Sequence, residues 1–593
     1  MYERSSTLMN RKFREYLIPT ILTSAAVSLT AVIDSLIVGN LLGEAALSAT
    51  GLASPIIFSL NALFFLFAVG GVTIAAVARG KRDEIYANRI FTLTFTTGII
   101  AMLVFITALL IFMKPITTAL AQGDPELAAM TRVYLTPTVF VGPVMMLIMG
   151  MAQFVRTDGK PKIAAYIAIT ANVVSMCLDY IFIRYMGMGI EGAGLATVIG
   201  YVTGIFVLIP YLRSKQRAFR FVKLRFDDFK ELAMITGTGL PKALTQGLSF
   251  ARTLVLNVLI VSALGMSGMA AMTVCVRALM IAAVFIGGSN DTLLPIVGTL
   301  FGEKDYTGIR FTVRRAFLFM MTACAGVTAL FLIFPGQIAG LFGIREGLDV
   351  AAPALRMYAL SLPIYGLNLM LQNFSQTTGR AKLATFIVTM NGFIFVVLFA
   401  MLFAQINGTY IWLSFVLAEL ATLLVVLCIG VRVRKKEKSN GILLLRESEG
   451  IFADFSISAT AEAGTGLSEK MIRFCRENGV DESASMRIGI AIEEMAVNTA
   501  NYGHKNKKGV IDVLIRITDG ELILRLRDDG VPFNPAEHLN SVEHNGPENK
   551  KLAVGGIEVV RRIAKDINYA WQLGFNVTIV TIPRKELITV GKS

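Results

Sequence analysis

Charged residues, cysteines and histidines are scarce in this chain of 593 residues. Only 17% of the residues are charged, against about 25% in an ordinary soluble domain, and the charges are sparse before Arg432 and dense after it. The five cysteines form no CxxC pair, which argues against a disulfide framework or a cysteine metal site. All three histidines lie beyond residue 503, which excludes a histidine-rich metal site in the apolar part. No GxxxxGK[ST] loop is present, which excludes an ATP-driven motor of the ABC type.

The chain is rich in long apolar runs, and 54% of its residues are hydrophobic. A helix needs about 20 apolar residues to cross about 30 Å of hydrocarbon. Lipid permits only helices or closed barrels, and these runs are too long for barrel strands. The sequence therefore predicts twelve transmembrane helices, at about residues 16–39, 46–78, 90–113, 132–154, 163–183, 192–212, 233–263, 269–300, 311–334, 354–377, 383–404 and 409–431.

The positive charges between these runs predict the orientation. Twenty-nine Lys and Arg residues fall at the two ends and in the loops after even-numbered helices, and about five fall on the other side. Because Lys and Arg concentrate in cytoplasmic loops, both termini are expected in the cytoplasm of a multi-pass protein in the cell membrane. The net charge of +14 is accounted for in this way, so the lipid bilayer is an expected partner and nucleic acid is not.

An internal repeat divides the apolar part into two halves. QFVRTDGKPK at 153–162 corresponds to NFSQTTGRAK at 373–382. Six helices, an even number, separate the copies, so both halves have the same orientation and the symmetry axis follows the membrane normal. We expect two six-helix lobes, 1–222 and 223–432. The same offset of 220–222 residues relates Leu42-Gly43, Gly80 and Asp83 to Leu264-Gly265, Gly302 and Asp305.

The segment AVIDSLIVGNLLGEAALSATGLASPI at 31–56 resembles the first-helix signature of the MATE (multidrug and toxin extrusion) transporters. The twelve helices, the duplicated lobes and the TDGKPK loop are also similar to that family, over about residues 10–432. The resemblance implies secondary antiport, in which inward Na⁺ or H⁺ drives the export of organic cations or other amphipathic compounds.

Four acidic residues lie inside predicted spans, where an ionisable side chain is costly and is a functional candidate by default. They are Asp34, Asp179, Asp291 and Glu419. Asp34 follows Pro19 on the same helix, and proline permits a bend because it removes a backbone hydrogen bond. The resemblance implies that this helix bends as the acid exchanges its cation or proton. The alternative is that these acids lie near headgroups, or pair with Arg252 or Arg277.

Asp179 shares one helix face with Asn172 and Ser175, which precede it by seven and four residues. The family usually has asparagine four residues before this aspartate, and this chain has Ser175 there. A hydroxyl group can still bind Na⁺, whereas a proton site needs only the carboxylates. The coupling ion is therefore left open between Na⁺ and H⁺, with Asp34, Asn172, Ser175 and Asp179 as the candidate residues.

The composition of the sequence changes after residue 432. A basic linker, 433–450, precedes a domain at 451–593 whose pattern predicts strands and helices in an α/β layer fold. The expected strands are 451–458, 509–517, 521–528, 568–573 and 575–582, and the expected helices are 465–478, 482–503 and 556–566.

Three local patterns in this domain contain residues suited to catalysis or ligand binding. Glu494 and Asn498 share a helix face, where a carboxylate can act as a general base beside an amide that binds Mg²⁺. Asp528 ends a strand and precedes Gly530, so it can accept a hydrogen bond from an adenine amino group. Gly555-Gly556 opens a helix after Lys551, and the bare amides of a helix N-terminus favour phosphate.

In order and spacing, IEEMAVNTANYGH, DDGVPF and GGIEVVRRIAKDINY resemble the N, G1 and G2 boxes of the GHKL (Bergerat) ATPase fold, and most of all the anti-sigma-factor serine kinases. The resemblance covers about 451–585. It implies that Glu494 is the catalytic base, Asn498 the Mg²⁺ ligand and Asp528 the adenine-binding residue of an ATP site, with 534–553 as its lid. Glu558 stands where the family usually has glycine, and its carboxylate would repel phosphate unless it points away.

The sequence thus predicts an all-α membrane protein of two six-helix lobes followed by an α/β sandwich of GHKL type. We expect a cation-coupled exporter whose cytoplasmic domain binds ATP and regulates transport or phosphorylates a regulatory protein partner. Three alternatives stay open: a membrane-anchored serine kinase whose apolar part is a sensor, a flippase for lipid-linked molecules, and a C-terminal domain that only docks a partner. The short apolar loops and Asp34 favour the exporter.

Overall fold

The computed structural model describes residues 2–122, 124–341, 348–437, 439–441, 443–446, 451–503, 509–532, 534 and 554–584. The chain forms two compact units. One, Phe13–Arg446, is called the helical unit, and the other, which joins Met1–Lys12 to Glu447–Ser593, is called the α/β unit. The segments before and after the helical unit therefore belong to one fold.

The first half of the helical unit is built from helices that run up and down. Their bounds are α1 Thr7–Leu42, α2 Glu44–Leu52, α3 Ser54–Phe64, η1 Phe65–Val69, α4 Gly70–Gly80, α5 Glu84–Ile111, α6 Met113–Leu120, α7 Pro125–Thr138, α8 Val141–Thr157, α9 Pro161–Tyr180, η2 Ile181–Tyr185, α10 Gly189–Arg213 and η3 Phe226–Glu231. An apolar core with edge-to-face phenylalanines, among them Phe91 and Phe154, fills the space between α5 and α8.

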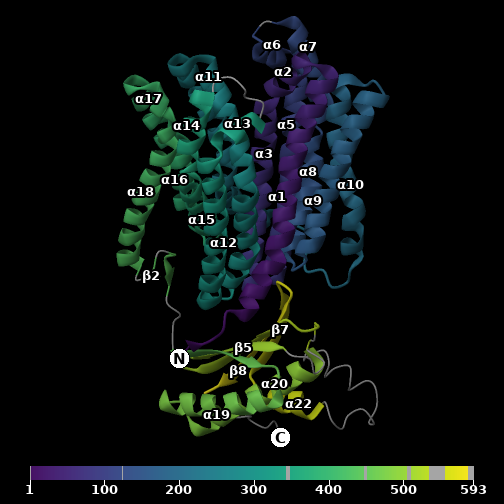
Figure 1. Ribbon diagram of the computed structural model, residues 1–593. Helices are drawn as coiled ribbons and strands as arrows, with labels where there is room; N and C mark the ends of the chain where they lie inside the picture. The colour runs from purple at the N-terminus through teal and green to yellow at the C-terminus, as the bar shows by residue number, and fades with distance from the viewer. Residues whose placement is uncertain are drawn as a thin grey trace. The chain divides into compact units, whose positions relative to one another are not determined.

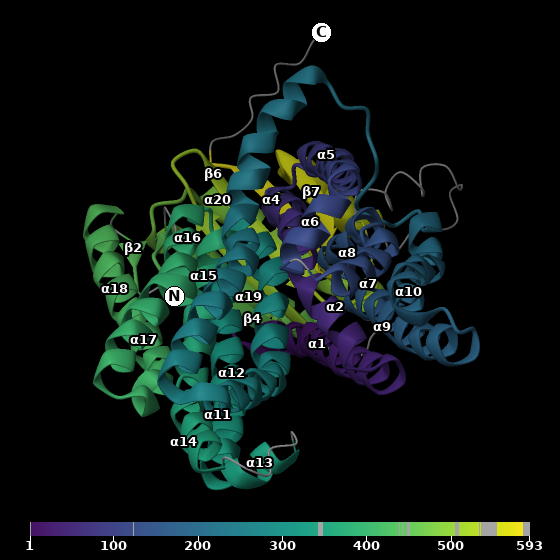
Figure 2. The ribbon, with the colours of Figure 1, turned by 90° about the horizontal axis from the view of Figure 1, so that it is seen from above.

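The second half repeats this arrangement, and the two halves form separate groups when they are viewed along the helices (Figure 2). The bounds are α11 Leu232–Gly302, α12 Tyr306–Ile333, α13 Pro335–Leu341, α14 Leu348–Ala359, α15 Leu362–Thr377, α16 Ala381–Thr389, η4 Met390–Ile394, α17 Phe395–Ile406, η5 Gly408–Trp412 and α18 Leu413–Glu437. A hairpin of β2 Ser439–Asn440 and β3 Leu445–Arg446 follows.

Each of the twelve predicted apolar runs lies on helical segments, although several runs are interrupted. In the described part of the chain, nine helices are individually long and apolar enough to span a membrane. The number is smaller because α11 contains two of the predicted runs, α7 and α8 meet at a bend of 41°, and α14 and α15 are separated at residues 360–361. The run predicted as one helix at 46–78 is divided at Ala53, where α2 ends and α3 begins.

The repeat found in the sequence has a matching backbone conformation in both halves. Gly43 has a φ of 86°, and Gly265, which interrupts α11, has a φ of 63°. These left-handed values favour glycine, so each marks the break between the first and second spans of its half. Asp83 and Asp305 each cap the following helix by accepting a hydrogen bond from a backbone N–H, at 2.9 Å and 3.0 Å.

The two halves touch through a second pair of repeated glycines. A Cβ atom on Gly80 would lie 2.9 Å from the Cα of Gly302, and a Cβ on Gly302 would lie 2.8 Å from the Cα of Gly80. The ends of α4 and α11 therefore pack backbone against backbone, which requires small residues at this crossing.

The α/β unit is a six-stranded sheet with helices on one face (Figure 1). Its strands are β1 Tyr2–Glu3, β4 Ile451–Ser458, β5 Val510–Ile517, β6 Glu521–Asp528, β7 Asp566–Gln572 and β8 Phe575–Pro583, in the order β1-β4-β5-β6-β8-β7. All neighbours are antiparallel except β1 and β4. The helices are α19 Ala461–Glu477, α20 Glu482–Asn498, continued by η6 Thr499–Gly503, and α22 Val554–Ile563. A buried apolar core joins them to the sheet.

Two boundaries differ from the sequence-based expectation. Residues 1–12, predicted to belong to the first lobe, are part of the α/β unit. Strand β1 pairs in parallel with β4, with Tyr2 opposite Asp454 and Glu3 opposite Phe455. The predicted linker at 433–450 includes the end of α18 and the hairpin β2–β3. Neither difference is encoded by local composition, since both depend on pairing with distant residues.

Arg4 fastens the N-terminal segment to this sheet. Its side chain is 1% exposed, and it donates hydrogen bonds to Asp454 (Nη1 to Oδ2, 3.2 Å) and Asp512 (Nε to Oδ2, 2.9 Å). Both carboxylates are as deeply buried as the arginine. A buried ion pair of this kind is held by its geometry, because removal of one partner leaves an uncompensated charge.

We therefore expect Arg4→Met to lower the free energy of unfolding of the α/β unit by about 3–5 kcal/mol. The matched control is Arg476→Met, which removes an exposed ion pair with Glu482 and should cost no more than about 1 kcal/mol. The measurement is native-state hydrogen exchange of β4 and β5 in the full-length protein. Equal effects of the two substitutions would show that Arg4 does not hold the sheet together.

Candidate functional site

Asp34 on α1 and Asp179 on α9 form a carboxylate pair inside the helical unit. The two carboxyl groups are close enough to share a hydrogen bond. Each also has a buried Oδ1 atom without a hydrogen-bond partner among the described residues. Two carboxylates that share a site resist simultaneous ionisation, so the pair is suited to hold one proton or one small cation.

Two tyrosines that the sequence did not single out border this pair. Tyr134 on α7 lies within electrostatic range of both Asp34 and Asp179, and Tyr201 on α10 lies within range of Asp34. Their phenol groups add polar surface beside the acids in an otherwise apolar region. No local pattern marks them, because a tyrosine inside an apolar run is ordinary and only the folded helices bring these two to the carboxylates.

The other two predicted coupling residues lie on the same helix as Asp179 but have different neighbours. The amide of Asn172 donates to the carbonyl of Ala168 at 2.8 Å. Ser175 is 3% exposed and packs against Gly200 of α10, where an added Cβ would lie 2.6 Å from its own. In the described structure no hydrogen bond joins either residue to Asp34 or Asp179.

The remaining acids of the predicted spans have partners of their own. Asp291 lies 3.8 Å from the Nζ atom of Lys242 and is 42% exposed, so its neighbour is a lysine instead of either arginine considered from the sequence. Glu419 is buried and accepts hydrogen bonds from the amides of Asn368 (2.6 Å) and Asn391 (3.3 Å). Glu419 and Arg252 line a small cavity of about 60 Å³ in the second lobe.

Pro19 lies within α1, fifteen residues before Asp34, and the helix continues through it. Its own carbonyl accepts a hydrogen bond from the Thr23 hydroxyl at 2.9 Å. Since proline has no N–H, one backbone hydrogen bond of α1 is missing here, and this is where the helix bends most easily.

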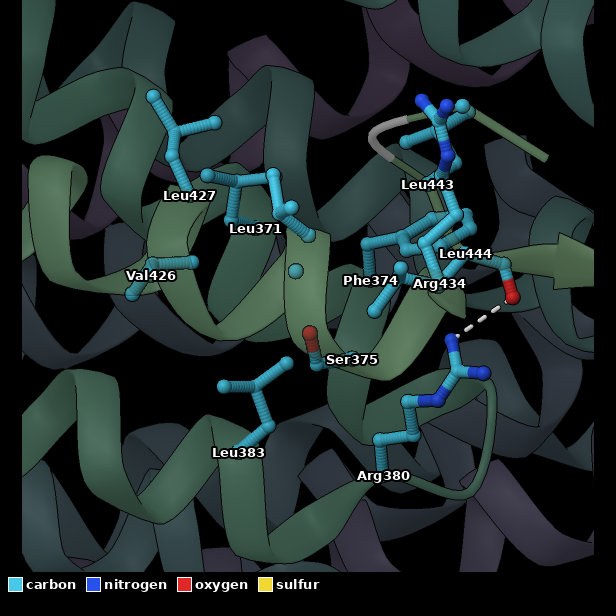
Figure 3. Close-up of a pocket in the computed structure, with 13 residues that line it drawn as sticks. Leu371, Phe374, Ser375, Arg380, Leu383, Val426, Leu427, Arg434, Leu443 and Leu444 are labelled. Carbon is cyan, nitrogen blue, oxygen red and sulfur yellow. Dashed lines mark hydrogen bonds between the residues drawn. The ribbon is translucent and has the colours of Figure 1, made fainter. Parts of the chain in front are cut away.

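A second cavity of about 110 Å³ lies where the hairpin β2–β3 meets α15, α16 and α18 (Figure 3). Arg380, in the second copy of the repeated loop, donates to the carbonyl of Leu444 at 2.9 Å, while leucines 371, 383 and 427 form apolar walls. This contact explains how the segment after α18 is held to the second lobe. None of the four acids of the spans lines it.

In the α/β unit, Glu494, the predicted catalytic base, lies against the start of α22. Glu494 and Asn498 lie on α20, and Asn498 is 5% exposed with a buried Nδ2 atom that has no partner in the described structure. A Cβ atom on Gly556 would lie 1.8 Å from Oε2 of Glu494. Glycine at 556 therefore lets the N-terminus of α22 approach Glu494 closely, as a site for a phosphate chain beside a base requires.

Asp528 lies at the end of β6 in a tightly bonded turn. Its Oδ1 atom accepts from the backbone N–H of Gly530 (2.8 Å) and from the amide of Asn576 (2.9 Å). Val531 donates its N–H to the carbonyl of Gly503 at 2.7 Å. These bonds join the end of α20 to the turn after β6, so the first two of the three predicted motifs lie side by side.

Glu558, the departure from the expected pattern, does not face the start of α22. Its Oε1 atom accepts from Arg562 at 2.7 Å, one turn further along the helix, and its side chain is 48% exposed. The carboxylate thus points away from the helix N-terminus. Gly555 is the second residue of α22, whereas Lys551 and the predicted lid, apart from Asn534, lie outside the described residues.

Comparison with known families agrees with this geometry. A family model described as MatE matches residues 19–181 and matches again at residues 241–402. The chain belongs to the MatE family. The tandem match corresponds to the two halves related by the repeat, and the predicted resemblance is confirmed. A second model, described as the histidine kinase-like ATPase domain, matches residues 457–582. This match confirms the predicted GHKL-like fold of the α/β unit.

Curated relatives within the MatE family are multidrug export proteins. MepA of Staphylococcus haemolyticus is 23% identical over 420 residues, which are 70% of this chain and 92% of MepA. MepA of Staphylococcus aureus is 25% identical over 389 residues, which are 64% of this chain and 85% of MepA. Homology thus supports a multi-pass MATE efflux transporter that carries a C-terminal ATPase-like domain.

Solved structures share the fold at low identity. A mutant of the Vibrio cholerae MATE transporter VcmN has a TM-score of 0.67 and 20% identity, covering 74% of this chain and 99% of its own. A MOP superfamily transporter from Pyrococcus furiosus, described as having a binding pocket of reverse polarity, has a TM-score of 0.67 and 20% identity, covering 73% and 97%. At these identities the likeness establishes the fold of the helical unit.

Proposed function

We propose that this MATE transporter is a secondary antiporter in the cell membrane, in which inward H⁺ or Na⁺ drives the export of organic cations or other amphipathic compounds. The observation that carries the proposal is the pair formed by Asp34 and Asp179. A carboxylate pair in a low-dielectric site changes its charge when it takes up a proton or cation. Since Asp34 lies on α1 beyond Pro19, that change acts on a helix whose backbone lacks a hydrogen bond at the proline.

The test is gradient-driven export by the full-length protein in liposomes. Asp34→Asn and Asp179→Asn should each reduce export of an amphipathic dye to the level of protein-free liposomes, because a pair with one amide no longer exchanges a charge. Asp291→Asn is the matched control, since Asp291 is partly exposed beside Lys242, and it should retain most of the activity. Wild-type rates in Asp34→Asn would remove this residue from the coupling mechanism.

We further propose that ATP and Mg²⁺ bind to the α/β unit on the cytoplasmic side and regulate transport. Glu494 and Asn498 would face the Mg²⁺ and phosphates, the amides of Gly555 and Gly556 the phosphates, and Asp528 with Gly530 the adenine. The outward orientation of Glu558 supports this assignment, because it keeps the Glu558 carboxylate away from the N-terminus of α22. The excess of Lys and Arg on one side supports a cytoplasmic location.

The N-terminal segment provides a route for this regulation. Residues 1–12 belong to the α/β unit, yet α1 begins at Thr7 and continues as the helix that carries Pro19 and Asp34. Arg11 pairs with Asp529, directly beside the proposed adenine-binding Asp528, and Lys12 lies 4.6 Å from the ring centroid of Phe575. A rearrangement of the turn at Asp528 is therefore transmitted to the first residues of α1.

We expect a nonhydrolysable ATP analogue with Mg²⁺ to change the rate of dye export by the reconstituted protein. Asp528→Ala should abolish nucleotide binding and the response while basal export continues. Arg11→Met should retain nucleotide binding, measured by calorimetry on the full-length protein, and lose the response. A full response in Arg11→Met would exclude this route, and an unchanged rate in the wild type despite bound nucleotide would refute regulation itself.

A second candidate function for the α/β unit is a protein serine kinase. The observation that favours it is the close approach of Glu494 to the start of α22, which brings a carboxylate that can act as a base next to a helix N-terminus that favours phosphate. In this reaction the serine oxygen attacks the γ-phosphorus, ADP leaves, and Glu494 takes the hydroxyl proton.

Phosphate transfer from ATP to a serine of a regulatory partner protein should occur in the wild type and in Asp34→Asn, and should disappear in Glu494→Gln. Incubation of the full-length protein with radiolabelled ATP and a cytoplasmic extract measures it. Transfer that persists in Glu494→Gln would come from another enzyme.

A further inference from the structure

A large cavity in the helical unit lies between α1 and the second half of α11. Its volume is about 770 Å³, within the range of roughly 300–1,000 Å³ that is usual for small-molecule sites. Its walls are mostly apolar, with Leu29 and Val32 on α1 and Met280 and Phe285 on α11. The two helices belong to different lobes, so a molecule held here touches both halves of the transporter.

Arg277 is the only charged residue among the described residues that line this cavity. Its side chain is exposed, as are the neighbouring cavity residues Met280 and Ile281. Ser28, Ser35 and Asn40 add neutral polar groups. A guanidinium group between low-dielectric walls attracts anions more strongly than it would in water and repels cations. Its planar donors also match the oxygens of carboxylate, sulfonate and phosphate groups.

The proposed coupling acids, Asp34 and Asp179, do not change the charge of the residues that line this cavity. Asp34 is absent from the lining, whereas its neighbour Ser35 is part of it. Successive residues of a helix point about 100° apart, so Asp34 faces Asp179 while the adjacent face of α1 forms the cavity wall. Glu419 lines a separate cavity of about 60 Å³, which is too small for an organic cation of drug size.

We infer that this cavity binds amphipathic organic anions. Arg277 holds the carboxylate, sulfonate or phosphate group, and the apolar walls of α1 and α11 hold the hydrophobic body. The inference rests on the proposed export function and narrows its substrate class. In this arrangement the coupling ion and the substrate bind at different places. The coupling ion binds at Asp34 and Asp179, and the charged group of the substrate binds at Arg277.

The test uses tetraphenylborate and tetraphenylphosphonium, which have nearly the same size and shape and opposite charges. Their binding to the full-length protein in nanodiscs of zwitterionic lipid is measured by equilibrium dialysis, with empty nanodiscs as the blank. The wild type should prefer the anion by about tenfold or more, and Arg277→Met should lose that preference, because the positive charge that attracts the anion in a low-dielectric cavity is removed. Arg277→Lys should retain the preference in part.

Arg252→Met is the matched control, because Arg252 is an arginine of the same helix that lines the small cavity instead, and it should keep the preference for the anion. Equal affinities of the wild type for both ions, or a preference for the cation, would overturn the inference. So would an unchanged preference in a folded Arg277→Met protein. These measurements need no ion gradient, so they are independent of the Asp34→Asn export assay, which tests the proposed function.

Discussion

The rest of this structure depends on two carboxyl groups that face each other in a low-dielectric region. Asp34 and Asp179 cannot both be charged at low cost, so whatever neutralises them also governs how α1 packs against α9. The same helix carries Pro19, provides one wall of the cavity beside Arg277, and begins within the α/β unit. One helix thus connects the carboxylate pair, the wall of that cavity and the α/β unit.

Much of this arrangement follows from local sequence. The run at 451–458 has the bounds of β4, and polar and apolar residues alternate over its second part, 454–458. The repeated glycines Gly43 and Gly265 lie at a shared backbone break, because only glycine adopts a left-handed conformation at low cost. Acids inside apolar runs identified Asp34 and Asp179 as candidates, because lipid makes their charges expensive. In each case a residue and its near neighbours contain the whole signal.

The remainder depends on residues that meet only after folding. Strand β1 has two residues and pairs with a strand some 450 positions away, so no periodicity in the sequence predicts it. Arg4 looked like a topology signal among other basic residues, yet it is buried between two carboxylates. Glu558 looked like an obstacle to phosphate because its direction, set by the Arg562 contact, is invisible in the sequence. Arg277 looked like a partner for membrane acids, and its place in a cavity wall needs the packing of α1 against α11.

The pairing of β1 with β4 has a consequence for biosynthesis. Arg4 leaves the ribosome before any membrane span, whereas Asp454 and Asp512 are made after all of them. Until translation reaches β5, the N-terminal segment has only part of its sheet to join, and Asp512 is not yet available to Arg4. The α/β unit can therefore close only after the whole helical unit has been synthesised.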